Sequence, residues 1–440
     1  MSQKKIILRG AFFLTAAGII GRIISFFYRI FLSRIIGAEG IGIYQLVFPL
    51  YALTCSITSS GIQTSISRSV AARTAANDTK GAIRIFQFGL ILSLALSICI
   101  AFILCLFHQT LAIHFVKEEK TEELLHILAF SLPFSAIHAC INGYYFGLKQ
   151  TEIPSLIQIL ETIFRFGSVI LIYKIFDSKN LPITPVIAVY GIVIEEFVSS
   201  VLSATALALH FSADKFTSNT SNRTAMSSFF YWHELLTTAM PLTLNRVLIN
   251  LLQSLEAMLI PIQLRACQLS SGDALRLYGI LTGMALPLIL FPTAITSSVS
   301  TMLLPVISEA HTKKNRSQII RTTRTTCGFF FILGIFCWIF FLLFGKTAGH
   351  LLFHSTDAGT YIQLLAWLCP LLYLTPALAS ILNGLGKTGH VFLCSTTAIL
   401  IRIFFVIFFI PRFGIYGYLL GLLAAQIWMS ICYTFFLFRP

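Results

Sequence analysis

Phe13–Gly37 reads FLTAAGIIGRIISFFYRIFLSRIIG, an apolar run long enough to cross a bilayer as a helix. Similar runs recur to the end of the 440 residues, and 56% of the chain is hydrophobic while only 11% is charged. No soluble globular class has this composition. The run is also too long for the apolar core of a signal peptide, so we interpret it as a retained membrane helix.

The chain as a whole is predicted to be an all-α, polytopic membrane protein. Helices are the expected spanning elements, because the apolar segments lack the short two-residue alternation of outer-membrane β-barrels. About twelve segments are long enough to span the bilayer. They cover roughly residues 10–35, 40–66, 82–107, 124–147, 153–174, 183–210, 234–262, 275–304, 319–345, 360–384, 389–410 and 414–438.

A polar stretch over residues 212–228 is the longest non-apolar segment and divides the spans into two halves. It predicts an N-terminal six-helix lobe over residues 1–211, a cytoplasmic linker over 212–233 and a C-terminal six-helix lobe over 234–440.

The two halves show internal similarity. Ile57-Thr58-Ser59-Ser60 recurs as Ile295-Thr296-Ser297-Ser298, and Pro49 and Pro287 precede the two motifs at the same distance. Repeats of six spans have the same orientation and are related by an axis along the membrane normal, with the cargo site between them. Further matches at nearly the same offset are Asn142-Gly143 with Asn383-Gly384, Lys149 with Lys387, and Arg165 with Arg402.

Lysine and arginine are concentrated in alternate loops. The net charge of +14 is explained by cytoplasmic loops under the positive-inside rule, rather than by nucleic-acid binding. One intervening loop, Lys117–Glu123, is acidic and is predicted to lie outside. Both termini are therefore predicted to face the cytoplasm. The cations assigned to inner loops are Arg68, Arg73, Lys80, Arg84, Lys149, Lys215, Arg223, Lys313, Lys314, Arg316, Arg321, Arg324 and Lys387.

Three arginines lie in or beside the first span. Arg22 and Arg29 are two helical turns apart and share one face. A charge near the bilayer centre costs at least about 3 kcal/mol, and membrane helices usually turn such charges towards a water-filled cavity. Arg22 and Arg29 are therefore candidate cavity residues, whereas Arg34 is expected to snorkel to the outer interface. A cationic cavity suits an anionic cargo.

The seventh span carries a polar stripe. Its members, at i, i+4, i+7 and i+10, are Arg246, Asn250, Gln253 and Glu256. Such a stripe faces protein or water rather than lipid, and cavity lining and hydrogen bonding between helices explain it equally well. The arginine and the two amides are candidate cargo-binding residues, and the carboxylate is a candidate for ion coupling.

Other ionisable residues lie inside later spans. Glu161 and Arg165, an i, i+4 pair, are expected to form a structural ion pair. Arg402 has no carboxylate four residues away, so it is a candidate cavity residue, with a partner on another helix as the alternative. Glu195 and Glu196 are candidates for coupling to H+ or Na+, because a buried carboxylate can carry a proton or bind sodium. The alternative is that one of them pairs with an arginine across the bundle.

Enzyme motifs are absent from the sequence. No Walker, GxSxG, HExxH or soluble DxD motif occurs, and no loop is large enough for a catalytic domain. The ten cysteines form no CxxC pair, and His350 and His354 with Asp357 lack a further convincing metal ligand. We therefore expect no enzyme, no metal and no cofactor.

Several stretches resemble a known family. LTAAGIIGRIISFFYRIFLSRIIGAEGIGIYQLVFPLYAL opens the chain, YGILTGMALPLILFPTAITSSVSTMLLPVISEA forms the eighth span, and INGYYFGLKQ and ILNGLGKTG end the fourth and tenth. They resemble the stage V sporulation protein B and polysaccharide biosynthesis branch of the MOP exporter superfamily, which also contains lipid II flippases and MATE drug exporters.

The resemblance implies two six-helix lobes around a central cavity, and flipping of a lipid-linked oligosaccharide by alternating access. The family's first-span arginine is matched by Arg22, and a second first-span cation by Arg29. Lipid II flippases look to have further cavity arginines in the second and eighth spans. This sequence departs from them there, with Thr58-Ser59-Ser60 and Thr296-Ser297-Ser298.

These features together favour a flippase for an anionic, polyprenyl-diphosphate-linked saccharide, such as a cell-wall precursor. The expected partners are that cargo, membrane lipids and H+ or Na+, with no nucleic acid. One alternative is a MATE-type cation or drug antiporter, whose cavity should offer carboxylates. A second is a non-transporting scaffold of a wall-synthesis complex.

Overall fold

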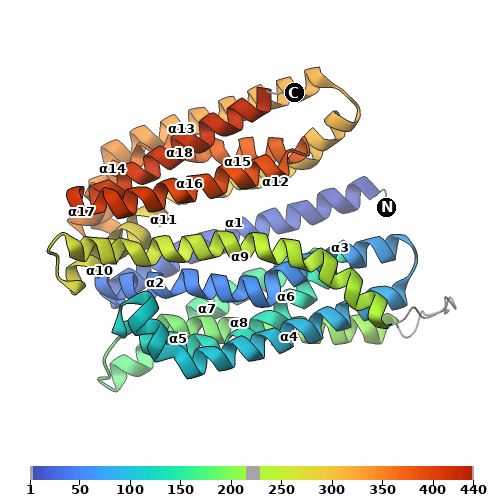
Figure 1. Ribbon diagram of the computed structural model, residues 1–440, viewed down its shortest axis with the longest axis horizontal. Helices are drawn as coiled ribbons and strands as arrows, with labels where there is room; N and C mark the ends of the chain where they lie inside the picture. Colours follow the sequence, from blue (N-terminus) through green and yellow to red (C-terminus); the bar gives the residue numbers. More distant parts are fainter. Residues whose placement is uncertain (1–2, 215–227, 439–440) are drawn as a thin grey trace. The chain divides into compact units, whose positions relative to one another are not determined.

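The computed structural model describes the backbone of residues 3–214 and 228–438, and within these ranges every regular element is a helix (Figure 1). Ten of the described helices are long and apolar enough to cross a membrane, and the number rises to 12 if each of two bent helix pairs is one span. The all-α, polytopic prediction is therefore confirmed.

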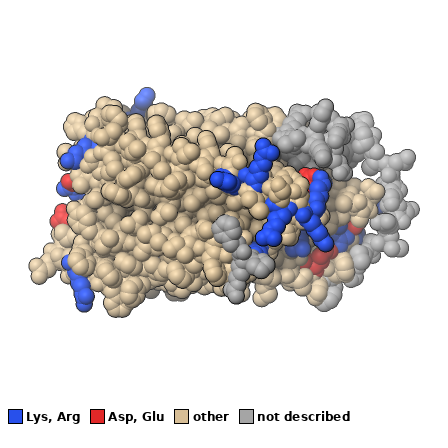
Figure 2. Space-filling view, turned by 90° about the horizontal axis from the view of Figure 1, so that it is seen from above, with Lys and Arg blue, Asp and Glu red and all other residues tan. Residues whose placement is uncertain are grey.

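Charged side chains are distributed as a membrane protein requires. On the face shown in Figure 2, one group of Lys and Arg lies at one end and a second lies nearer the other end, with a band of other residues between the two groups. Such a band matches the hydrocarbon layer of a bilayer, in which ionisable residues are expensive.

The chain forms two compact units. Unit 1 comprises Met1–Ile24 and Leu46–Ser254, and unit 2 comprises Ser25–Gln45 and Leu255–Pro440. Three helices, α1 (Gln3–Ile35), α2 (Gly37–Cys55) and α9 (Ser228–Ala266), contribute residues to both units. The predicted lobes over 1–211 and 234–440 place their boundary elsewhere, within the start of α9, and they stay a prediction.

Unit 1 is organised around α6, which packs against α3, α4 and α8. Ile62 and Ile66 of α3 meet Phe86 of α4 and Tyr144 of α6 in its core. Short helix α5 packs on α4, and α7 packs on α8. Besides the second half of α2, its elements are the π-helix η1 (Ser56–Ser60), α3 (Gly61–Ala75), α4 (Thr79–Thr110), the π-helix η2 (Leu111–Val116), the 3-10 turn η3 (Glu119–Thr121), α5 (Glu122–Ala129), α6 (Leu132–Gly147), α7 (Glu152–Ser178) and α8 (Val186–Asp214).

Unit 2 repeats this order of packing. Helix α15 packs against α12, α13 and α18, α14 packs on α13, and α16 packs on α18. The bend between α5 and α6 is 51°, and that between α14 and α15 is 57°. Its elements are α10 (Ser271–Gly279), the π-helix η4 (Ile280–Ala285), α11 (Leu286–Leu290), α12 (Thr293–Thr312), α13 (Arg316–Phe353), α14 (Thr356–Ala366), α15 (Cys369–Gly384), α16 (Thr388–Phe408), α17 (Ile410–Phe413) and α18 (Ile415–Phe438).

Two glycines allow α2 and α10 to pack backbone against backbone in unit 2. A Cβ on Gly279 would collide with the carbonyl oxygen of Ala38 and would lie 2.6 Å from the amide nitrogen of Gly42. A Cβ on Gly42 would in turn collide with the carbonyl oxygen of Leu275. Small residues of this kind let membrane helices approach closely.

The predicted eighth span, 275–304, is wrong as a single helix. Helix α11 ends at Leu290 and α12 begins at Thr293, with Pro292 at the break. Proline lacks the amide hydrogen that a continuous helix needs, and its ring crowds the preceding turn. The described helix that satisfies the criteria for crossing a membrane is Ser271–Leu290.

Candidate functional site

Arg22 lies in α1 on the part of that helix that belongs to unit 1, directly after the buried Gly21. Its side chain is exposed, and among the described side chains it makes no hydrogen bond or ion pair. Arg29, two turns further along α1, is half-buried and belongs to unit 2. Arg22 therefore presents its guanidinium from within an apolar span.

Arg34 has a structural contact at the end of α1. Its Nε and Nη2 donate to the carbonyl oxygens of Leu352 and Leu351 at 3.1 and 3.0 Å. These carbonyls belong to the last turn of α13, where no further turn of helix is present to supply donors. Arg34 thus closes the C-terminus of α13.

The polar stripe of α9 is divided between the units. In unit 1, Arg246 donates to the carbonyl oxygen of Ser60 at 2.7 Å and to Oγ1 of Thr64 at 2.9 Å. Asn250 donates to the carbonyl oxygen of Ala52 at 3.2 Å. These bonds join α9 to α2, to the last residue of the π-helix η1 and to α3. Exposed Gln253 is the next member of the stripe, and cargo contact by all three residues stays a prediction.

Glu256, the fourth member of the stripe, lies in unit 2 and pairs with Arg402. Its Oε2 is 3.0 Å from Nη2 of Arg402 on α16, and its Oε1 accepts a hydrogen bond of 3.2 Å from Tyr418 on α18. No carboxylate lies four residues from Arg402 in the sequence, and in the structure its partner comes from another helix.

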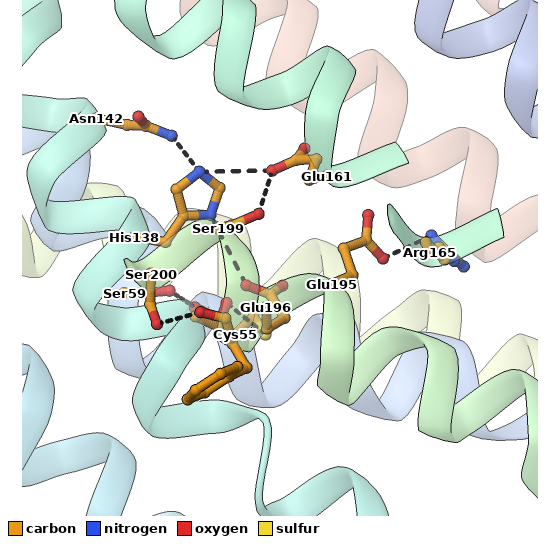
Figure 3. A network of polar contacts seen from close by, with 12 residues as sticks. Cys55, Ser59, His138, Asn142, Glu161, Arg165, Glu195, Glu196, Ser199 and Ser200 are labelled. Carbon is orange, nitrogen blue, oxygen red and sulfur yellow. Dashed lines mark hydrogen bonds and ion pairs between the residues drawn. The ribbon is translucent and has the colours of Figure 1, made fainter. Parts of the chain in front are cut away.

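Unit 1 contains a carboxylate–histidine cluster, drawn in Figure 3. It forms where four helices of that unit meet, and its side chains are only partly exposed. We define the cluster as Tyr51 of α2, His138 of α6, Glu161 and Arg165 of α7, and Glu195 and Glu196 of α8.

His138 lies between two carboxylates of the cluster. Its Nε2 is 3.6 Å from Oε2 of Glu161, and its Nδ1 is 3.8 Å from Oε2 of Glu196. Tyr51 donates to the other oxygen of Glu196 at 2.9 Å. Asn142, one turn along α6, lies 2.7 Å from His138 Nε2. Each of the two ring nitrogens of His138 therefore faces a polar group.

The remaining charged groups of the cluster also have polar partners. Arg165 pairs with Glu195 at 3.2 Å across α7 and α8, and Ser199 donates to Glu161 at 3.1 Å. Pairing of one of the two adjacent glutamates with an arginine was the alternative to an ion-coupling role, and Glu195 has such a partner. Glu196 instead faces Tyr51 and His138.

Sequence reasoning missed His138 and Tyr51 as members of a site. The available signal was a histidine one helical turn before Asn142 in an otherwise apolar span. With three carboxylates against one arginine, the cluster carries a formal charge of −2 when His138 is neutral and −1 when it is protonated. Chemically, the cluster is suited to taking up a proton.

In the part of the chain that the structure describes, no group of three or more His, Cys, Asp or Glu side chains has the arrangement of a metal site.

Comparison with solved structures identifies the fold. The chain resembles an inward-facing multidrug resistance MATE family transporter of the MOP superfamily, with a TM-score of 0.74, 16% identity and 97% of each chain covered. It also resembles a MOP superfamily transporter from Pyrococcus furiosus, described as having a binding pocket of reversed polarity, with a TM-score of 0.67, 17% identity and coverage of 99% of this chain and 97% of that one.

Comparison with curated sequences gives relatives in Bacillus subtilis. Stage V sporulation protein B of Bacillus subtilis (strain 168) is 24% identical over 435 residues, covering 98% of this chain and 83% of the relative. The lipid II flippase MurJ of the same organism is 25% identical over 190 residues, covering 40% of this chain and 35% of the relative.

The model of the polysaccharide biosynthesis protein family matches residues 7–311, which is more than half of the chain. This range includes Arg22, the carboxylate–histidine cluster and Glu256. The chain therefore belongs to the polysaccharide biosynthesis protein family and has the fold of the MOP superfamily.

Proposed function

We propose that this chain flips an anionic, polyprenyl-diphosphate-linked saccharide across the cytoplasmic membrane by alternating access. Membership of the polysaccharide biosynthesis protein family and the MOP fold support a transporter or flippase. The names of two relatives, a stage V sporulation protein and a lipid II flippase, favour a cell-wall precursor as the cargo. Both termini are proposed to face the cytoplasm, following the positive-inside rule.

The observation that carries the proposal is the exposed guanidinium of Arg22 within an apolar span. Arg165 and Arg402 have carboxylate partners, and Arg246 donates to oxygen atoms of α3 and η1. Arg22 keeps its planar fork of donors for a ligand, and that geometry matches two oxygens of a phosphate group. Arg29, on the same face of α1, is proposed to contact the second phosphate.

We assign ion coupling to the carboxylate–histidine cluster. Its excess of negative charge attracts H+ or Na+, and Glu196 and His138 share one contact that a proton would strengthen. The polar stripe members Arg246, Asn250 and Gln253, together with Arg402, are proposed to contact the cargo. Glu256 and Glu195 are proposed as secondary coupling residues, since each neutralises an arginine.

A MATE-type antiporter of organic cations is the second candidate. The likeness to MATE transporters and the net negative cluster of unit 1 favour it. In such a protein the carboxylates would bind the cargo, and Arg22 would be dispensable. The two candidates therefore differ in which charged group transport needs.

The test is a flipping assay in proteoliposomes that contain the full-length protein and a fluorescent polyprenyl-diphosphate saccharide. We expect wild-type protein to expose the saccharide to an external quencher, and Arg22→Ala to reduce the rate at least about a hundredfold, because a charge-assisted bidentate contact is lost. Arg22→Lys should restore only part of the rate, because an ammonium lacks the planar fork.

Arg324→Ala is the matched control, since Arg324 is an exposed arginine near the N-terminal end of α13. Wild-type flipping by Arg22→Ala at equal protein abundance would exclude the phosphate-binding role. Uptake or efflux of an organic cation that survives Arg22→Ala but fails in Glu196→Gln would favour the antiporter instead.

A further inference from the structure

A hollow of about 690 Å³ lies within unit 2, remote in sequence from the cluster of unit 1. It opens where the end of α1, the helix α10 and the connection between α13 and α14 come together, and its lining includes Arg34, Arg276, His350 and His354. One carboxylate, that of Asp357, is also in the lining. Nitrogen donors therefore outnumber acidic groups around this space.

Arg34 is held in a fixed orientation at the hollow. Its Nε and Nη2 donate to the last carbonyls of α13, so the plane of the guanidinium is set. Nη1, with its two N–H groups, lies outside these two bonds. A cation that is already ordered loses little conformational entropy when it binds a ligand.

Arg276 and Asp357 form an exposed pair on the same lining. Their Nη2 and Oδ2 atoms are 3.2 Å apart, and the side chains are 57% and 48% exposed. Ion pairs at that level of exposure contribute about 0–1 kcal/mol and are readily exchanged for a stronger partner. An incoming phosphate, with more charge and more acceptor oxygens than a carboxylate, is such a partner.

The start of α14 adds a second source of positive potential. Ser355 caps this helix by accepting from the amide of Ala358, and Thr356 and Asp357 of its first turn line the hollow. The N-terminus of a helix carries a partial positive charge that favours anions. On the other side, Ile280, Met284 and Phe353 supply apolar surface.

We infer that this hollow of unit 2 binds a phosphate group, held by Arg34, Arg276 and the first turn of α14. The apolar wall suits a phosphate that is attached to a lipid, and inorganic phosphates share the same anionic chemistry. The site goes beyond the proposed function, because it uses none of the residues assigned there to cargo or to ion coupling.

The site is tested by two substitutions that should change its affinity for phosphate in opposite directions. The full-length protein in phosphatidylcholine nanodiscs is titrated with inorganic diphosphate by calorimetry. In a second arm, nanodiscs doped with phosphatidylglycerol are analysed for retained lipid by native mass spectrometry. We expect Arg276→Gln to weaken binding at least about tenfold, since one charge-assisted contact is lost. Asp357→Asn should strengthen binding about threefold or more, because it frees Arg276 from its competitor.

Lys313→Gln is the matched control, because Lys313 and Glu309 form an exposed pair of unit 2 that does not line the hollow. Binding in the diphosphate arm identifies a free phosphate ligand, and binding in the lipid arm alone identifies a lipid headgroup. Failure of wild-type protein to bind either probe, or a change of the same sign in Arg276→Gln and Asp357→Asn, would overturn the inference. Flipping activity plays no part in this readout, so the result is independent of the proposed function.

Discussion

Glu256 on α9 and Arg402 on α16 form an ion pair of 3.0 Å inside unit 2. The Glu256 side chain is 6% exposed and that of Arg402 is 24% exposed, and Tyr418 donates to the second carboxylate oxygen. The pair joins helices that are far apart in sequence. In a membrane span, each partner removes the cost of burying the other alone.

Removing one partner should therefore be more harmful than removing both. We expect Glu256→Gln to lower the free energy of unfolding by about 3–5 kcal/mol, the range found when one member of a buried pair is deleted. Glu256→Gln combined with Arg402→Gln should cost clearly less than the sum of the two single changes. Unfolding in detergent, followed by circular dichroism, measures all three variants.

Lys313→Gln serves as the control for this cycle, since its partner Glu309 is exposed and the pair should contribute little. Strict additivity of the two single substitutions would show that Glu256 and Arg402 do not stabilise each other.

This pair also shows where sequence analysis ends. Hydropathy predicted the helices and the membrane class, because every spanning segment must bury its backbone polar groups in a helix. Arg402 was recognised as an intramembrane cation, but its partner was not, since the contact depends on how α9 and α16 pack. For the same reason His138 was missed, although its neighbours Glu161 and Glu196 were noticed individually.

Local breaks in the helices were harder to predict than the helices themselves. The run over 275–304 is mostly apolar, and mean hydropathy does not reveal that the helix is interrupted at Pro292. The bends before α6 and α15 lie beside Pro133 and Pro370, which occupy the first turn of each restarted helix. Periodicity and composition carry no signal for these angles.

The carboxylate–histidine cluster should determine how transport responds to an ion gradient. We expect His138→Gln to reduce the stimulation of flipping by an imposed proton or sodium gradient at least about fivefold, because the group shared by Glu161 and Glu196 can no longer change its charge. Basal flipping without a gradient should change much less. Proteoliposomes with and without the gradient measure both rates.

His108→Gln is a matched control for this prediction. His108 also lies near a carboxylate in unit 1, 3.5 Å from Glu122, but outside the cluster. If His138→Gln keeps the full response to each gradient, coupling at this cluster is excluded.

Backbone contact between α2 and α10 should make Gly279 intolerant of a side chain. We expect Gly279→Ala to lower the free energy of unfolding by about 1–3 kcal/mol, since its methyl group would meet the backbone of Ala38 and Gly42. Gly328→Ala in α13 is the control, because a Cβ there meets nothing within 4 Å. It should be neutral or stabilising by up to about 1 kcal/mol, as alanine favours helix.

Unfolding in detergent again supplies the measurement. Equal stability of the Gly279→Ala and Gly328→Ala variants would mean that α2 and α10 are not in close contact in the folded protein.

Membrane orientation can be tested at three exposed positions of the loops, Lys80, Glu119 and Lys314. Single cysteines are introduced there after replacement of the ten native cysteines, and intact cells are treated with an impermeant thiol reagent. We expect labelling of Glu119→Cys alone, because the loops that contain Lys80 and Lys314 are rich in cations and should be held in the cytoplasm. Permeabilised cells, in which all three positions should react, control for the reactivity of each thiol.

Labelling of Lys314→Cys but not Lys80→Cys from outside would mean that the two halves of the chain have opposite orientations. An arrangement of that kind would be incompatible with repeats related by an axis along the membrane normal, and therefore with the proposed two-lobed transporter.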